Sequence, residues 1–343
     1  MKNKTTHSSD KEILYTTLIP YKYLYNIRLN HSSKRLISWL FIHLFLILYW
    51  IMAGGCYMIY NVSNNYNASN NLETCNVQFH YSIIYILSVL LFTFSHYYIY
   101  ELGYILNDIN AIKKDKVSLR LTTTQASTIL KNIILIYITH FIPLILSLII
   151  LSISPIFRLF ILKHYISASL LSLICHTCFC IYNNTKYNNR IIIYPILQIL
   201  KYTTPLVLLL SIKPLVLSYN FILYETTFDS YISIIFILMI IIYPLEISIE
   251  RFSMPTKRYK IIKKIIPDEE SKKKFRVIYY FIISLITTII YTAITIDNIG
   301  IKQVGIIHYI TNIILTLLPL YLFLLYRLLI KASKTKPSND KMA

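Results

Sequence analysis

The sequence predicts an all-α membrane protein, a polytopic bundle of transmembrane helices. Of its 343 residues, 56% are hydrophobic and only 14% are charged, whereas soluble domains carry roughly a quarter charged residues. Several apolar runs also reach the ~20 residues that a helix needs to cross ~30 Å of hydrocarbon. Together, these two observations exclude an ordinary soluble globular domain.

Eight apolar runs of this length occur along the chain, each with few or no charges. They cover residues 36–60, 82–106, 127–153, 156–182, 191–217, 230–249, 276–297 and 304–330. We therefore predict a cytoplasmic N-terminal segment (1–35), a transmembrane domain (36–331) and a cytoplasmic tail (332–343). Because the segment before the first run is polar and basic and lacks a small-residue cleavage pattern, we expect no secretory signal peptide.

The net charge of +19 is distributed as membrane topology requires. Lys and Arg gather at both termini and after the second, fourth and sixth runs, whereas residues 61–81 and 218–229 contain neither. Since basic loops stay on the cytoplasmic side, both termini are expected there. The basic charge is thus explained by the lipid bilayer, and we expect no nucleic acid partner. The prediction is a multi-pass protein of a bacterial inner membrane.

Five of the fifteen acidic residues lie at the cytoplasmic ends of the second and sixth runs. Glu101, Asp108 and Asp115 are separated by seven residues, and Glu246 and Glu250 by four, so each group shares one helix face. Stacked like charges repel unless a cation lies between them. Mg²⁺, which binds a few carboxylates together with phosphate oxygens, is one such cation. The alternative is that these acids pair with Lys and Arg at the membrane edge.

The stretch "NDINAIKKD", followed by "KVSLR", resembles the UbiA superfamily of intramembrane prenyltransferases. Asn107 and Asp108 match the opening pair of the motif that follows the second helix in that family, and Asp115 matches its last aspartate. Ala111 replaces the middle aspartate.

The second acidic motif of the family is similar to Glu246-x-x-x-Glu250, with the spacing kept and both aspartates replaced by glutamate. "IIYPILQILKY" (192–202) resembles the Tyr-Pro and basic segment that opens the fifth helix of the family, and it offers Lys201. The family usually has nine helices, so we expect eight or nine here.

The resemblance implies a UbiA-like bundle whose cavity opens toward the cytoplasmic leaflet. It implies Mg²⁺-dependent transfer of a prenyl group from an isoprenoid diphosphate to an acceptor. Mg²⁺ and basic side chains would stabilise the charge of the leaving diphosphate. The implied catalytic metal ligands are Asp108, Asp115, Glu246 and Glu250. The implied substrate-binding residues are Asn107, Glu101, Lys116, Arg120, Lys186, Arg190 and Lys201.

The substitution at Ala111 leaves two alternatives open. One branch of the superfamily transfers a phosphoribosyl group to a polyprenyl phosphate, which uses the same kind of site. A non-catalytic membrane transporter or scaffold is the other alternative. A transporter places its ionisable residues near the bilayer midplane, whereas these acids lie at the cytoplasmic ends. Their position therefore favours an enzyme that acts on a lipid headgroup.

Overall fold

The computed structural model describes residues 10–40, 72–114, 120–185 and 190–212, with single residues and short pieces between 48 and 289. The chain divides into two compact units. The first comprises Met1–Leu40 and Asn71–Ile212, and the second comprises Phe41–Asn70 and Lys213–Ala343. The four continuous described ranges all belong to the first unit.

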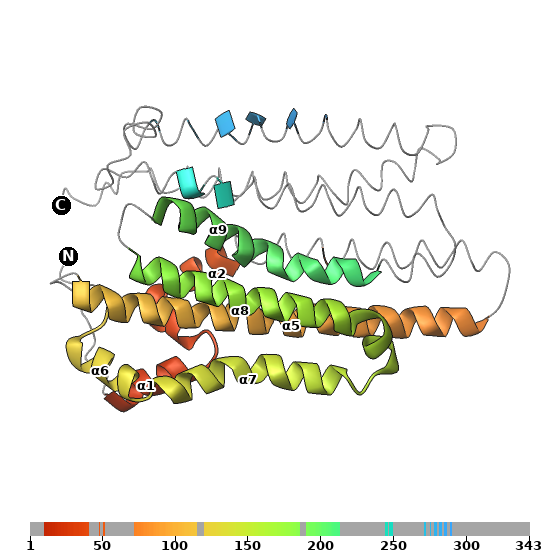
Figure 1. Cartoon of the computed structure of the whole chain (residues 1–343), viewed down its shortest axis with the longest axis horizontal. Coiled ribbons are helices and arrows are strands. Elements are labelled where there is room, and N and C mark those ends of the chain that lie inside the picture. The colour runs from red at the N-terminus through yellow and green to blue at the C-terminus, as the bar shows by residue number, and fades with distance from the viewer. Residues whose placement is uncertain are drawn as a thin grey trace, which may run out of the picture. The chain divides into compact units, whose positions relative to one another are not determined.

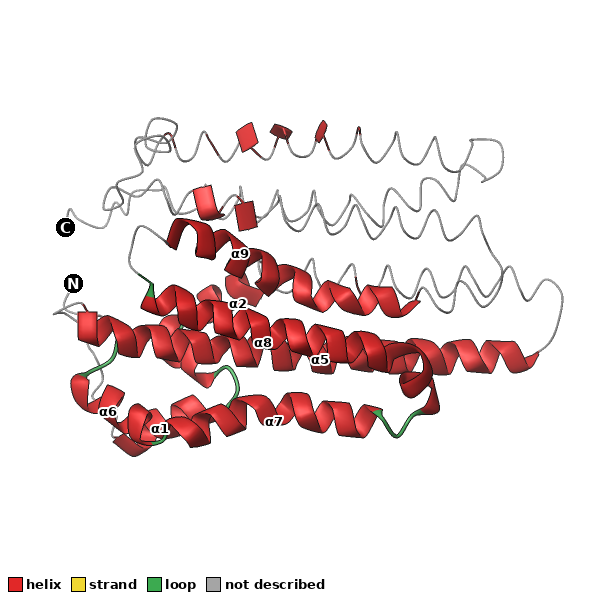
Figure 2. Cartoon of the chain, viewed as in Figure 1, coloured by secondary structure: helices red, strands yellow, loops and turns green. Residues whose placement is uncertain are grey.

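Every regular element within these ranges is a helix (Figure 2). The elements are α1 (Asp10–Leu18), the π-helix η1 (Leu24–Arg28), α2 (Ser33–Leu40), α5 (Leu72–Lys114), α6 (Thr123–Lys131), α7 (Ile133–Leu151), the π-helix η4 (Phe157–Ile161), α8 (Leu162–Asn184), α9 (Arg190–Thr203) and the 3₁₀-helix η6 (Thr204–Ile212). For the described part of the chain, the all-α prediction is confirmed.

Four helical stretches in the described part are long and apolar enough to cross a membrane. They are His80–Ile112, Ile133–Leu151, Phe157–Asn184 and Ile193–Ser211, and they correspond to the predicted runs 82–106, 127–153, 156–182 and 191–217. The other four predicted runs (36–60, 230–249, 276–297 and 304–330) lie largely outside the described residues, so the total of eight or nine helices stays a prediction.

The surface of α7 agrees with a lipid environment. Ile134, Ile145 and Ile149 are 73%, 55% and 59% exposed, and a continuous apolar face of this kind is rare on soluble monomers. On a helix that crosses a bilayer, the same side chains would contact acyl chains, which is not unfavourable for apolar groups.

Helix α6 precedes α7 and begins at a capping box. In it, the Thr122 hydroxyl accepts from Gln125 N and the Gln125 amide oxygen accepts from Thr122 N.

Helix α5 packs against both α7 and α8 (Figure 1). It differs from its predicted run because it begins at Leu72 and continues unbroken to Lys114. The acidic segment therefore belongs to the same rigid helix as the apolar span. Leu102, Ile105 and Ile109 keep this end of the helix in the hydrophobic core, and they supply the physical reason for its extension.

Residues of the N-terminal segment also belong to the bundle. Ile13 of α1 and Tyr23 lie in the same core cluster as Leu102 of α5 and Ile129 of α6. Helix α1 contacts α6 and α7, and Figure 1 shows it beside them. The segment that the sequence presents as polar and basic thus contributes apolar side chains to the packing of the helical bundle.

The close approach of α5 and α8 depends on Gly103. A Cβ at this position would overlap the ring of Phe179, and Asn183 Nδ2 donates to Gly103 O at 3.2 Å. A glycine here lets the two helices approach closely, as small residues do at membrane helix interfaces.

Gly103→Ala is expected to lower the free energy of unfolding by roughly 1–3 kcal/mol, because overpacking forces Phe179 out of its place. Thermal unfolding of the purified full-length protein in detergent measures this effect. The double variant Gly103→Ala/Phe179→Ala should lose less stability than the sum of the two single variants. Strict additivity would contradict the predicted contact.

Candidate functional site

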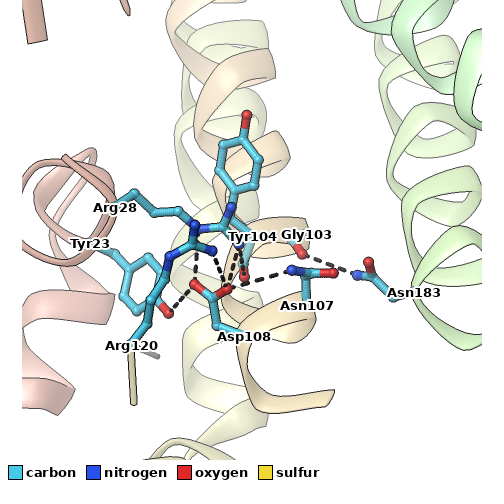
Figure 3. A network of polar contacts seen from close by, with 8 residues as sticks. All are labelled: Tyr23, Arg28, Gly103, Tyr104, Asn107, Asp108, Arg120 and Asn183. Atoms are coloured by element: carbon cyan, nitrogen blue, oxygen red, sulfur yellow. Dashed lines mark hydrogen bonds and ion pairs between the residues drawn. The ribbon is translucent and has the colours of Figure 1, made fainter. Parts of the chain in front are cut away.

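The carboxylate of Asp108 is the centre of a polar cluster at the end of α5 (Figure 3). Arg28 binds it through two nitrogens, with Nε 2.9 Å from Oδ2 and Nη2 2.7 Å from Oδ1. Arg120 Nη1 donates to Oδ1 at 3.0 Å, and the Tyr23 hydroxyl donates to Oδ2 at 2.9 Å. Asn107 Nδ2 lies 3.5 Å from Oδ1. Both carboxylate oxygens are therefore engaged by donors.

The members of the cluster differ in burial. The Asp108 side chain is 3% exposed and that of Arg28 is 15% exposed, whereas Arg120 is 46% exposed. Burial, followed by the charge of Asp108, raises the pKa of Tyr23 well above its ordinary value, so its hydroxyl keeps the proton that it donates. The fork of Arg28 is the pairing best suited to a carboxylate.

A third basic residue, Lys201 of α9, lies near the side chain of Tyr104. The guanidinium of Arg28 lies 4.3 Å from the ring centroid of Tyr104, and its Nη2 donates to the backbone oxygen of Tyr104 at 3.1 Å. Lys201 Nζ lies 3.5 Å from the Tyr104 hydroxyl and 4.5 Å and 5.1 Å from the ring centroids of Tyr100 and Tyr202. Lys201 is only 2% exposed. The aromatic faces partly compensate its desolvated charge.

The basic side chains around Tyr104 and Asp108 outnumber the carboxylates that pair with them. Arg28 and Arg120 both pair with Asp108, and no described carboxylate lies within ion-pair distance of Lys201. Buried charge without a counter-charge is unfavourable. The arrangement therefore favours an anionic ligand such as a phosphate.

Glu101 lies two helical turns before Asp108 and has another role. Its carboxylate accepts the backbone N–H of Tyr21 at 2.8 Å and that of Leu24 at 2.6 Å, and the residue is 2% exposed. The prediction that Glu101 and Asp108 share a helix face agrees with this geometry, since both bind the segment from Tyr21 to Arg28. Glu101 thus contacts protein backbone, and its predicted contact with substrate stays a prediction.

Arg190, a predicted phosphate ligand, contacts the end of α8 in this structure. Its Nε donates to Thr185 O at 3.0 Å and its Nη2 to Asn183 O at 3.2 Å. These carbonyls at the helix C-terminus are groups that a basic side chain stabilises. Its role toward phosphate stays a prediction.

The remaining predicted residues lie outside the described part of the chain: Asp115, Lys116, Lys186, Glu246 and Glu250. The described residues by themselves do not fit a magnesium ion. They contain no group of three His, Cys, Asp or Glu placed to hold a metal, and both oxygens of Asp108 already accept from arginine. The magnesium site therefore stays a prediction that depends on the undescribed acids.

Sequence reasoning missed Arg28, Tyr23 and Tyr21, which it assigned to a polar cytoplasmic segment. The signal was the stretch "YKYLYNIRL" (21–29), in which six of nine residues are aromatic or aliphatic. Such residues in an otherwise polar tail indicate a segment that packs on the membrane domain.

Comparison with models of known protein families, with curated proteins and with solved structures finds no match. The resemblance to the UbiA superfamily therefore depends on the motifs of the sequence itself.

Asp108→Asn is expected to destabilise the protein by roughly 3 kcal/mol, because removing one partner of a buried ion pair leaves the other charges uncompensated. Arg120→Gln, at a half-exposed position, is the matched control and should lose less than about 1 kcal/mol. Arg28→Gln should fall between them. Thermal unfolding in detergent measures this order. An Arg120→Gln variant as unstable as Asp108→Asn would show that the cluster does not centre on Asp108.

Proposed function

We propose that the chain is an integral membrane transferase of the UbiA type, which transfers a prenyl group from an isoprenoid diphosphate to an acceptor at the cytoplasmic face. The observation that supports the proposal is the group of three basic side chains beside the Asn107–Asp108 pair. Arg28 and Arg120 share one carboxylate, and buried Lys201 has no described carboxylate within ion-pair distance. A diphosphate would supply an anionic partner for Lys201 and further acceptor oxygens for Arg28 and Arg120, which share Asp108.

The depth of the cluster suits a lipid headgroup. Asp108 lies four residues before Ile112, where the candidate span ends, which is about 6 Å along the helix axis. Lys201 lies eight residues inside the span that begins at Ile193, about 12 Å from that end. The cations thus extend inward from the membrane edge, where a diphosphate would meet them while its isoprenoid chain stays in the apolar interior.

Each basic residue has a distinct role in this proposal. Arg28 and Arg120 would bind phosphate oxygens through their planar forks. Lys201, held by tyrosine rings, would stabilise the charge that develops on the leaving diphosphate where water is scarce. The magnesium requirement of the proposal depends on Asp108 together with Asp115, Glu246 and Glu250.

The second candidate function is phosphoribosyl transfer to a polyprenyl phosphate. Ala111, which replaces the middle aspartate of the first motif, favours it over ordinary prenyl transfer. Because the phosphoribosyl donor also carries a diphosphate, the same cations would bind it. The two functions therefore differ in the donor that the site accepts.

Thermal unfolding of the full-length protein in detergent tests the proposal. We expect Mg²⁺ and geranyl or farnesyl diphosphate together to raise Tm, since a ligand at 100 times its Kd stabilises the folded state by about 2.7 kcal/mol. A larger shift with Mg²⁺ and phosphoribosyl diphosphate would select the second function. Absence of any shift with all these ligands would contradict both functions and favour the scaffold.

Two variants locate the effect. Asp108→Asn and Glu246→Gln should each abolish the part of the Tm shift that requires Mg²⁺. Glu225→Gln is the matched control, because the sequence assigns this residue to the opposite membrane side, and it should respond like the parent. If Asp108→Asn and Glu246→Gln also respond like the parent, the predicted metal ligands are wrong.

A further inference from the structure

The short helix η1 is attached to α5 at both of its ends. The N–H of Leu24, the first residue of η1, donates to one carboxylate oxygen of Glu101. The N–H of Tyr21, three residues earlier, donates to the other. At its last residue, Arg28 binds Asp108. Residues 21–28 are thus fixed by two acids of one helix, spaced seven residues or about 10 Å apart along its axis.

The backbone of this segment requires an acceptor such as Glu101. Tyr21 has a φ of 61°, so the chain turns sharply there before η1 begins. The first N–H groups of a helix have no acceptor within it, and a buried N–H left without one is destabilising. The two oxygens of the Glu101 side chain each accept one of these N–H groups, so both donors are satisfied by a single residue.

The attachment by Glu101 fixes where Arg28 can lie. From Leu24 to Arg28 the chain forms a single helical turn, with Leu29 N bonded to Leu24 O at 2.8 Å. Such a turn transmits the position of its first residue to its last. Glu101 touches neither Arg28 nor Asp108 in any described contact, yet it holds the backbone that brings them together.

We propose that Glu101 is a positioning residue, which holds residues 21–28 on α5 so that Arg28 reaches Asp108 and completes the cationic site. The N-terminal segment is then a wall of the substrate site rather than a separate tail. Only the anionic nature of the ligand rests on the proposed function, whereas the attachment itself is independent of it.

Other contacts also hold this segment and provide a control. The Tyr21 hydroxyl donates to Phe94 O at 2.7 Å, and the Tyr98 hydroxyl donates to Leu18 O at 2.8 Å. Tyr21→Phe removes the first contact but leaves both hydrogen bonds from the backbone to Glu101. If position depends on Glu101, this variant should keep residues 21–28 in place.

Hydrogen exchange of the full-length protein in detergent tests the attachment. Glu101→Gln keeps the size of the side chain but directs an NH₂ group at one backbone N–H, so amides of residues 19–28 should exchange roughly tenfold faster or more. Amides of α7 and α8 should be unchanged, and Tyr21→Phe should behave like the parent. If Glu101→Gln does not fold, Glu101→Asp replaces it with the same expectation. Unchanged exchange at residues 19–28 would overturn the proposal.

Binding of inorganic pyrophosphate, measured by calorimetry, tests whether Glu101 acts through Arg28. Arg28→Lys should weaken binding several-fold in the parent and have little further effect in Glu101→Gln, because Arg28 is already displaced there. Additive losses would overturn a positioning role. If the parent binds no pyrophosphate, the proposed function fails, while the exchange measurement still decides whether Glu101 positions the segment.

Discussion

The ion pairs of the Asp108 carboxylate are the interaction on which the described half of the protein depends. A carboxylate near the end of a membrane helix is unfavourable unless donors surround it, and here the donors come from distant parts of the chain. Arg28 and Tyr23 precede Asp108 by some 80 residues, and Arg120 follows it just before α6. Asp108 thereby links the N-terminal segment, the end of α5 and the residues that precede α6.

The sequence was sufficient for features that depend on local composition. The all-α class and four of the membrane spans follow from the length and apolarity of individual runs. The seven-residue spacing of Glu101 and Asp108 correctly indicated a shared face. The apolar run 82–106 covers only the middle of α5, which extends from Leu72 to Lys114. The helical spacing of Glu101 and Asp108 indicated the continuation beyond the run, and buried Ile109 continues the apolar stripe there.

The partners of the acids could not be predicted in the same way. Spacing shows that two carboxylates on one helix face need positively charged or hydrogen-bond-donating partners. The sequence alone does not distinguish Mg²⁺, an arginine and a backbone N–H as that partner. The choice depends on Arg28 and Tyr21 reaching α5 from 80 residues away, and no local pattern encodes that approach. The alternative of pairing at the membrane edge describes Asp108 in this structure, whereas Glu101 binds backbone instead.

Every buried charge of the site needs a partner of opposite charge. This requirement holds for the arginine–Asp108 pairs and for the proposed binding of a diphosphate. Arg28 and Arg120 have Asp108 as their counter-ion. If the proposed diphosphate and Mg²⁺ were bound, Arg28 and Arg120 would hold phosphate oxygens and Asp108 would be a ligand of the metal, so each buried charge would keep a partner. Such a change of partner requires Arg28 to stay within reach of both partners, and a segment anchored independently by Glu101 meets this condition.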